Sequence, residues 1–274
     1  MIYGNISACQ ETDCSLNFEQ LQPLSPFGLT VRAVEPGSDV KLVASRLKGW
    51  VDEHRFVVLK GFAPLNGQAL PDFCRSLGEL LEWEFGAVND LRVDPGTKNY
   101  LYTNRAVPFH WDGAFLPRSP HYIFFHCDVA PDPQSGGETL FCDTVRLLDR
   151  TPPDLQKLWN DIVITYTTEK IVHYGGTFSS PLLDSHPTLG IRVLRYAEPV
   201  EDLNPVQLNI AGISEDKQPA FLEDMHRRLN HESCCHAYQW ESGDIVIADN
   251  FALLHGRRAF AKETERHIRR VNIL

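Results

Sequence analysis

Phe109-His110-Trp111-Asp112-Gly113 is the most informative stretch of this chain, because it places a histidine and an aspartate two residues apart. Side chains on a β-strand alternate between its two faces, so His110 and Asp112 would point to one side and Trp111 to the other. A histidine nitrogen and a carboxylate oxygen could then bind the same cation. We predict that this pair supplies two of the three protein ligands of a metal site.

The third ligand is predicted much later in the chain, where an apolar strand ends in a histidine. In Asp249-Asn250-Phe251-Ala252-Leu253-Leu254-His255-Gly256-Arg257, His255 stands directly before a glycine. Alone, such a histidine is more often a structural residue with satisfied hydrogen bonds. With His110 and Asp112 it completes a set of two histidines and one carboxylate, which binds non-haem Fe(II) on one face and leaves the opposite positions open.

Two further residues indicate what occupies the open positions. Arg266 follows His255 by eleven residues, and its planar guanidinium can bind a carboxylate through two parallel hydrogen bonds. Thr139, at the end of Ser135-Gly136-Gly137-Glu138-Thr139, could add a hydroxyl hydrogen bond, although a lone threonine there could equally be an ordinary β residue. We therefore predict an O2-activating enzyme that uses Fe(II) and 2-oxoglutarate.

A second His-x-Asp pattern, His126-x-Asp128, competes with the first. Its histidine lies inside the apolar run that begins at Tyr122, and its aspartate comes just before Val129-Ala130-Pro131. This context favours a core histidine and a turn aspartate. Asp112 is instead followed by Gly113 at a predicted strand end, where a site can open, so we assign the metal to His110 and Asp112.

Charge narrows the classes of partner. The formal net charge is -10, which argues against a general nucleic-acid-binding protein. Positive charge is concentrated near the C-terminus, where we expect most of the basic residues to lie on a solvated face, although a basic segment in an acidic protein also suits small carboxylate ligands. These residues are Arg257, Arg258, Lys262, Arg266, Arg269 and Arg270.

The cysteines and the apolar segments indicate a cytoplasmic protein. The seven cysteines are irregularly spaced and include no CxxC motif, so reduced thiols are expected in place of a disulfide framework. Residues 1–17 lack the basic and apolar regions of a signal peptide. No apolar stretch is long enough to span a membrane.

Short strands separated by proline and glycine turns dominate the predicted secondary structure. With helices early in the chain and in insertions, the pattern favours a mainly β fold with flanking helices, a double-stranded β-helix or jelly roll. We expect one domain over residues 1–274, with residues 1–25 as an irregular leader. Strands are predicted at 28–34, 56–60, 100–103, 122–129, 138–141, 162–172, 191–196, 237–240, 244–248, 253–255 and 269–273, and helices at 39–54, 66–80, 143–161 and 215–230.

With these residues in view, the chain resembles the taurine/2-oxoglutarate dioxygenase superfamily over roughly residues 28–274. The resemblance implies that His110, Asp112 and His255 bind iron. It also implies that Thr139 and Arg266 bind 2-oxoglutarate. The family's second arginine, which in the taurine enzymes contacts the substrate's anionic group, corresponds to Arg270.

Longer segments are similar to the PvcB-type enzymes of isonitrile biosynthesis. These segments are Trp83-Glu84-Phe85-Gly86-Ala87-Val88, Pro108-Phe109-His110-Trp111-Asp112-Gly113, Ala248-Asp249-Asn250, Leu254-His255-Gly256-Arg257 and Arg266-His267-Ile268-Arg269-Arg270-Val271. This resemblance implies that the substrate is an isocyano derivative of an aromatic amino acid, typically tyrosine, and that an alkene is installed in it. Some homologues lose the substrate carboxylate in the same step and others keep it.

One position departs from the taurine enzymes. They carry a substrate-binding asparagine four residues before the first iron histidine, where this chain has Ala106. The departure argues against taurine as the substrate. It leaves the nearby Asn104 as a candidate contact to a different substrate.

Two other functions remain open at this point. A related enzyme could hydroxylate a small carboxylate or sulfonate, and its product would carry a new oxygen that an alkene lacks. A β-barrel that binds a metal or ligand without turnover, such as a sensor, would form no succinate. The sequence does not decide between tyrosine and tryptophan derivatives, the fate of the carboxylate, the residues that hold the aromatic ring, or the oligomeric state.

Overall fold

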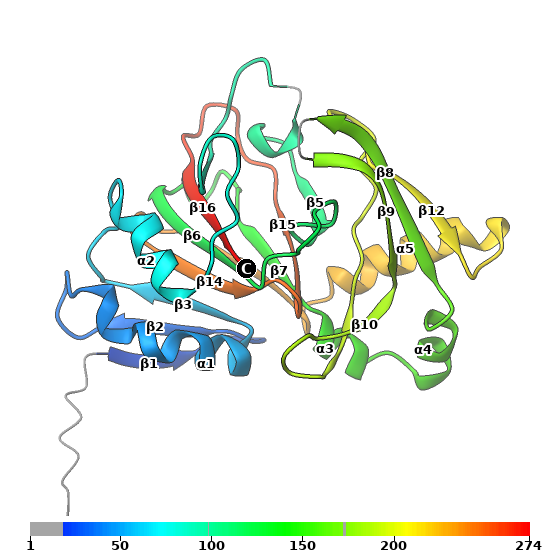
Figure 1. Cartoon of the computed structure of the whole chain (residues 1–274), viewed down its shortest axis with the longest axis horizontal. Coiled ribbons are helices and arrows are strands. Elements are labelled where there is room, and N and C mark those ends of the chain that lie inside the picture. Colours follow the sequence, from blue (N-terminus) through cyan, green and yellow to red (C-terminus); the bar gives the residue numbers. More distant parts are fainter. Residues whose placement is uncertain (1–18, 98, 172–173) are drawn as a thin grey trace, which may run out of the picture.

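The computed structural model describes residues 19–97, 99–171 and 174–274 of the chain. Its largest element is a seven-stranded sheet, which places the C-terminal strand between two strands from the first half of the chain (Figure 1). Only β2 and β3 run parallel among the paired strands described. In order across the sheet, the strands are β1 (Glu19–Pro23), β2 (Leu29–Ala33), β3 (Phe56–Lys60), β14 (Ile245–Asp249), β6 (Tyr122–Val129), β16 (His267–Ile273) and β4 (Val88–Leu91).

A four-stranded antiparallel sheet packs against the large sheet. Aromatic side chains fill the space between them: Phe56 of β3 stacks on Phe141 of β7, with ring centroids 4.8 Å apart. Two facing antiparallel sheets around a shared core form the jelly roll that the sequence predicts. The strands of the smaller sheet, in order, are β13 (Cys235–Tyr238), β7 (Thr139–Asp143), β15 (Leu253–Arg257) and β5 (Val107–His110).

Helices and a three-stranded sheet cover the outer faces. Helices α1 (Ala44–His54) and α2 (Ala69–Leu77) pack on the large sheet through fully buried residues such as Leu47 and Val51. The smaller sheet is covered by a second apolar cluster from the middle of the chain. That region comprises α3 (Thr144–Asp149), α4 (Pro153–Trp159), β8 (Val163–Ile171), β9 (Tyr174–Pro181), β10 (Leu183–Ser185), β11 (Arg192–Leu194), β12 (Gln207–Ala211) and α5 (Gln218–Leu229).

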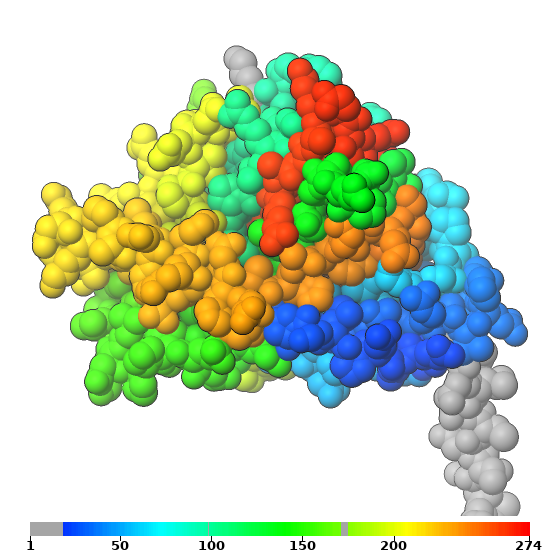
Figure 2. All heavy atoms as spheres, turned by 180° about the vertical axis from the view of Figure 1, so that it is seen from behind, coloured from blue at the N-terminus to red at the C-terminus, as the bar shows by residue number. Residues whose placement is uncertain are grey.

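These two flanks are separated over part of the molecule. In the space-filling view from behind, the chain around β12 (yellow) is far from the N-terminal strands (blue), whereas the gold to orange chain that follows it reaches them (Figure 2). The smaller sheet lies between them (Figure 1). The two strands that carry the predicted metal ligands, β5 and β15, are therefore central in the fold.

Several predictions of secondary structure were wrong or incomplete. The strand predicted at 100–103 is a 3-10 turn, Tyr100–Tyr102, because the Asn99 side chain accepts a hydrogen bond from Leu101 and caps the turn. The predicted leader contains β1, which pairs with β2; residues 1–18 lie outside the described residues. The sequence also missed four short or polar strands, β4, β9, β10 and β12.

In the described part of the chain, no helix is long and apolar enough to cross a membrane. Free thiols are found at Cys74, Cys127, Cys142, Cys234 and Cys235, the first four of them buried.

Candidate active site

The three predicted metal ligands lie together at the ends of two neighbouring strands. His110 is the last residue of β5, His255 lies in the middle of β15, and the register pairs them directly. Nε2 of each histidine lies 3.7 Å from Oδ1 of Asp112, two residues beyond β5. An ion that binds each atom at about 2.1 Å can bridge such a separation.

Both histidines present a free lone pair to this point. Nδ1 of His110 lies 2.9 Å from the carbonyl oxygen of Pro108, and a carbonyl can only accept, so Nδ1 carries the hydrogen and Nε2 does not. Nε2 of His255 is buried and has no hydrogen-bond partner among the described residues. Burial, together with the nearby His110, lowers the pKa of His255 to about 3, which keeps the imidazole in its neutral, metal-binding form.

Asp112 supplies the negative charge. Burial alone would raise its pKa, but the Arg270 guanidinium together with His110 and His255 outweighs burial and holds the pKa well below the ordinary range. Nη1 of Arg270 lies 3.0 Å from both carboxylate oxygens and donates a hydrogen bond to Oδ1. Asp112 is therefore an ionised ligand whose orientation is fixed by an arginine.

The main chain of Asp112 is held by Asn250, to which the sequence assigned no role. Oδ1 of Asn250 accepts from the Asp112 amide, and Nδ2 donates to the carbonyls of Asp112 and Pro120, all at 2.9 Å. Arg195 donates to the Asn250 carbonyl at 2.8 Å and stacks on Trp111 at 4.6 Å. Partners that orient ligands in this way tune metal affinity.

The donor set fits one class of metal. Two neutral imidazoles and one carboxylate on a β scaffold suit non-haem Fe(II) with open coordination positions. The unpartnered Nε2 of His255 gives independent support, because a buried nitrogen without a hydrogen bond is costly unless something binds it. His110, Asp112 and His255 would hold the ion.

Arg266 and Thr139 offer a place for a carboxylate. Arg266 is buried, and no described residue forms a hydrogen bond or ion pair with it; burial and the adjacent Arg257 lower its pKa to about 9. Thr139 lies opposite Arg257 in the ladder and accepts a hydrogen bond from Trp240, which leaves its own hydroxyl hydrogen to donate. A buried cation without an anion fits the far carboxylate of 2-oxoglutarate.

A cavity of ≈ 340 Å³ opens beside the metal ligands. His110, Asp112 and Arg270 form part of its wall, whereas Arg266 and Thr139 do not line it. The two residues predicted to bind the cosubstrate carboxylate are therefore not part of the cavity wall. Aromatic residues form a large part of the wall: Trp83, Phe85, Tyr100, Tyr102, Phe109, Trp111, Phe115 and Tyr166.

The other two predicted substrate contacts have different surroundings. Arg270 lines the cavity, and its Nε is buried with no hydrogen-bond partner. Asn104 does not line the cavity, and its side-chain amide donates to the Phe260 carbonyl at 3.0 Å. The structure thus brings Arg270, and not Asn104, to the metal ligands.

The prediction that the C-terminal basic residues are mostly solvated was wrong. Arg258 and Lys262 are exposed, but Arg257, Arg266, Arg269 and Arg270 are buried. Arg257 donates to the carbonyls of Leu101, Thr103 and Arg105. The burial of these arginines could not be predicted from the sequence, because arginine is rarely buried without a partner. The partners of Arg257 are backbone carbonyls, which no sequence pattern reveals.

The second His-x-Asp pair is fully engaged by the protein, as the sequence predicts for a structural pair, although Asp128 lies within β6 and not in the predicted turn. Nε2 of His126 accepts from the Leu65 amide at 3.3 Å, and Nδ1 lies 2.8 Å from Oδ1 of Asp128. Arg269 binds the same carboxylate at 2.7 Å. No ligand atom of this pair is left for a metal.

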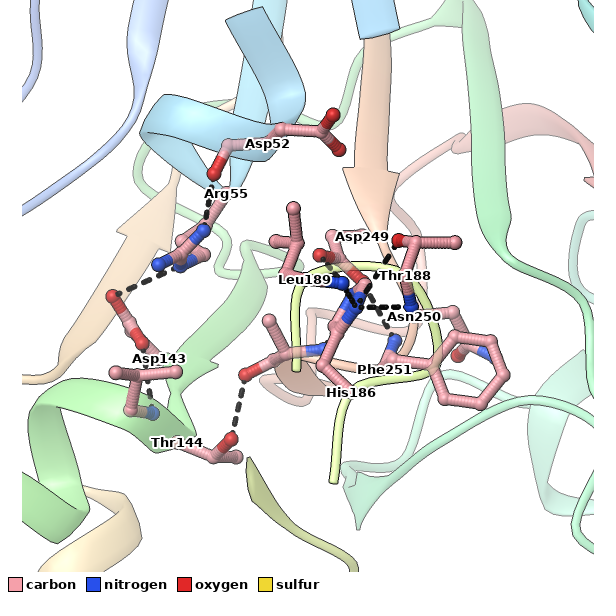
Figure 3. Close-up of polar contacts among 12 residues, drawn as sticks. Asp52, Arg55, Asp143, Thr144, His186, Thr188, Leu189, Asp249, Asn250 and Phe251 are labelled. Carbon is pink, nitrogen blue, oxygen red and sulfur yellow. Dashed lines mark hydrogen bonds and ion pairs between the residues drawn. The ribbon is translucent and has the colours of Figure 1, made fainter. Parts of the chain in front are cut away.

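A further cluster, His121, His186 and Asp249, has the composition of a metal site but not its chemistry. Nδ1 of His186 accepts from the amide of Leu189 at 3.1 Å, so Nε2 carries the hydrogen that it donates to Asp249 at 2.9 Å (Figure 3). A protonated Nε2 cannot bind a metal. The pair instead holds Asp249 at the end of β14, where its other oxygen accepts from the amides of Phe251 and Ala252 in the turn that follows.

Comparison with known proteins agrees with this geometry. Residues 18–272 match the model of the taurine catabolism dioxygenase TauD, TfdA family. The chain is 43% identical over 259 residues to a 3-((Z)-2-isocyanoethenyl)-1H-indole synthase of Fischerella ambigua, covering 93% of this chain and 95% of the relative. It is 35% identical to a tyrosine isonitrile desaturase of Pseudomonas aeruginosa, covering 90% and 87%.

A solved structure is similar over the whole length. PvcB, an Fe, alpha-ketoglutarate dependent oxygenase from an isonitrile synthetic pathway, superposes with a TM-score of 0.79 at 32% identity. The match covers 100% of this chain and 95% of PvcB.

Proposed function

Because the chain belongs to the taurine catabolism dioxygenase TauD, TfdA family and is an Fe(II)- and 2-oxoglutarate-dependent oxygenase, we propose that it oxidises an isocyano aromatic amino acid to an alkene. The single observation that carries this proposal is the aromatic cavity that meets the metal ligands and Arg270. The 35–43% identity to two enzymes named for isonitrile desaturation or isocyanoethenyl-indole synthesis supports the same substrate class.

The protein's residues would divide the work between two sides of the metal. When bound, Fe(II) with 2-oxoglutarate and O2 supplies an oxidant that removes hydrogen from a C–H bond. His110, Asp112 and His255 hold the ion, and Arg266 with Thr139 holds the far carboxylate of the cosubstrate. The overall reaction balances when substrate, 2-oxoglutarate and O2 give alkene, succinate, CO2 and water.

Arg270 is proposed to fix the substrate's carboxylate. One of its terminal nitrogens is engaged by Asp112, but its Nε is buried and unpartnered, so donors remain for a second anion. Holding the carboxylate there would set which C–H bond faces the metal, and a misplacement of about 1 Å can cost about a hundredfold in rate. A purely structural ion pair with Asp112 is the alternative role.

The aromatic wall suits a flat ring. Trp111 meets Tyr166 edge to face, with ring centroids 5.6 Å apart, so the rings already hold one another in place. A rigid apolar cavity of this size encloses a small ligand and excludes water, which protects the oxidant. A small sulfonate such as taurine would leave most of this surface without contacts.

The test is product analysis with the wild-type enzyme. Fe(II), 2-oxoglutarate and O2 are incubated with isocyano-tyrosine or isocyano-tryptophan, and the product is examined by mass and NMR. Loss of two hydrogens, with or without loss of CO2, and formation of succinate are expected. Arg270→Ala should lose the alkene product while still binding iron and 2-oxoglutarate.

Two results would replace the proposal. A product that gains oxygen from a small carboxylate or sulfonate, with both isocyano compounds left untouched, would assign a hydroxylase. Absence of succinate under all conditions, with metal bound, would favour a sensor without turnover.

A further inference from the structure

Asn272 is a buried amide on the cavity wall with no hydrogen-bond partner. Its side chain is 3% exposed, and Oδ1 is shielded from solvent without a donor among the described residues. The other asparagines that line the cavity have their oxygens engaged: Asn89 accepts from Tyr102, Asn99 from the Leu101 amide and Asn204 from Thr168, each at 3.0 Å. A buried acceptor left without a donor costs stability, so its retention needs a reason.

The position of Asn272 on β16 places it next to Arg270 on the same face of the strand. On β16, Arg270 and Asn272 share one face, while Val271 between them packs into the core on the other face. Residues two apart on a strand are roughly 6.6–6.8 Å apart. Asn272 lies beyond Arg270 on the side away from Arg266, so it belongs to the substrate end of the site.

The substrate class offers few hydrogens to this acceptor. An isonitrile nitrogen carries no hydrogen, and an ionised carboxylate only accepts, so an isocyano aromatic amino acid has one kind of polar hydrogen, the phenol O–H or indole N–H of its ring. Glu198 also lines this wall, but its two oxygens contact the Phe109 amide and His226. Oδ1 of Asn272 is an acceptor on the wall that no described residue uses, so it can accept a hydrogen bond from the ring.

We propose that the Asn272 side chain accepts a hydrogen bond from the polar hydrogen of the substrate's aromatic ring, while Arg270 holds the carboxylate. This inference rests on the proposed function. The two anchors would lie on either side of the Cα–Cβ bond that becomes the alkene. Asn272 thereby selects aromatic substrates that carry a ring donor and sets the depth at which they bind.

Matched substrates that differ only in this hydrogen test the proposal. Isocyano-tyrosine is compared with isocyano-phenylalanine, and isocyano-tryptophan with its N1-methyl derivative. For at least one pair, the wild type should favour the donor-bearing member by about tenfold to a hundredfold in kcat/KM, because a buried acceptor is left unpaired by the other. The same preference should appear in Kd for the metal-free protein, measured by calorimetry.

Asn272→Leu should remove the preference in both measurements, with most of the loss falling on the donor-bearing member. Asn89→Leu is the matched control: it changes another asparagine of the wall whose oxygen is already engaged, so it should shift both members by a similar factor and keep the preference. If Asn272→Leu does not fold, Asn272→Ala gives the same comparison with less bulk.

Each remaining outcome decides the matter. A wild type that turns over both members of each pair equally overturns the role of Asn272 and leaves the proposed function intact. An Asn272→Leu protein that keeps the wild-type preference, or that loses both members equally, also overturns it. Turnover of none of the four compounds would overturn the proposed function itself.

Discussion

The two His-x-Asp pairs of this chain have the same local pattern and opposite fates. His126 and Asp128 lie on β6 of the large sheet, and the protein occupies both of their functional groups through Leu65 and Arg269. His110 and Asp112 lie at the end of β5, and their free lone pairs converge with His255. What separates a structural pair from a metal site is therefore whether the surroundings use up the ligand atoms.

Removing one aspartate from each pair gives the largest expected contrast. Asp112→Ala should abolish Fe(II) binding and succinate formation, because it removes the only carboxylate of the ligand set. Asp128→Ala should keep the metal and lose only stability. Anaerobic Fe(II) titration with a succinate assay measures both; retention of full iron binding by Asp112→Ala would show that the two pairs were assigned the wrong way round.

Two different arginines are predicted to act at the two sites: Arg266 binds the cosubstrate at the metal site, and Arg269 binds Asp128. Arg266→Ala should raise the 2-oxoglutarate requirement by roughly one and a half to more than three decades, since losing the partner of a buried carboxylate costs roughly 2–5 kcal/mol. Thr139→Val should have a smaller effect. Arg269→Ala, which loses its bond to Asp128, should leave the requirement unchanged; the reverse result in the cosubstrate titration would mean that the C-terminal register is wrong.

A third contrast concerns the residue that holds the loop of Asp112. Asn250→Ala removes three hydrogen bonds to that loop and should weaken Fe(II) binding by about tenfold to a hundredfold, as expected for a partner that orients a ligand. Calorimetry with Fe(II) or Mn(II) measures the affinity. Asn89→Ala is the control, because the oxygen of this cavity asparagine accepts from Tyr102 and its side chain forms no hydrogen bond to Asp112. Equal weakening by both variants would contradict the positioning role.

His126→Ala should affect stability and leave the metal alone. The substitution leaves the Leu65 amide without its acceptor and removes one hydrogen bond of Asp128. The loss should lower the free energy of unfolding by about 1–3 kcal/mol. Urea unfolding of the metal-free protein measures the loss. A fall in iron affinity with unchanged stability would contradict the structural assignment of this pair.

The last expected effect is a pH dependence to which one histidine of each site contributes. Burial lowers the pKa of His126 and of His255, the latter to about 3, so below about pH 6.5 each histidine binds protons more weakly in the folded protein than in the unfolded one. The stability of the metal-free protein should therefore fall as pH drops from about 6.5, by up to about 1.4 kcal/mol per pH unit for each histidine. Urea midpoints between pH 7.5 and 5 measure it, and His126→Gln should show a shallower dependence than the wild type.

Sequence reasoning found the jelly roll and the residues at the metal because both follow from short-range patterns. Alternating strands and the spacing of His110, Asp112, His255 and Arg266 are visible in the chain itself. Burial of Arg257, Arg269 and Arg270, and the free amide of Asn272, depend on which strands become neighbours. The strand predicted at Tyr100 was wrong, because three aromatic or apolar residues in a row occur both in strands and in short helical turns. The Asn99 side chain, which caps the turn, determines that a turn forms here.

The position of β16 has a consequence for how the protein is made. This strand lies between β6 and β4, and β4 has no other strand partner among those described. Because synthesis proceeds from the N-terminus, β4 and one edge of β6 stay unpaired until His267–Ile273 has left the ribosome, although both were made long before. The same segment carries Arg269, Arg270 and Asn272, so the sheet and its binding site are completed together, after every other strand of the sheet has been made.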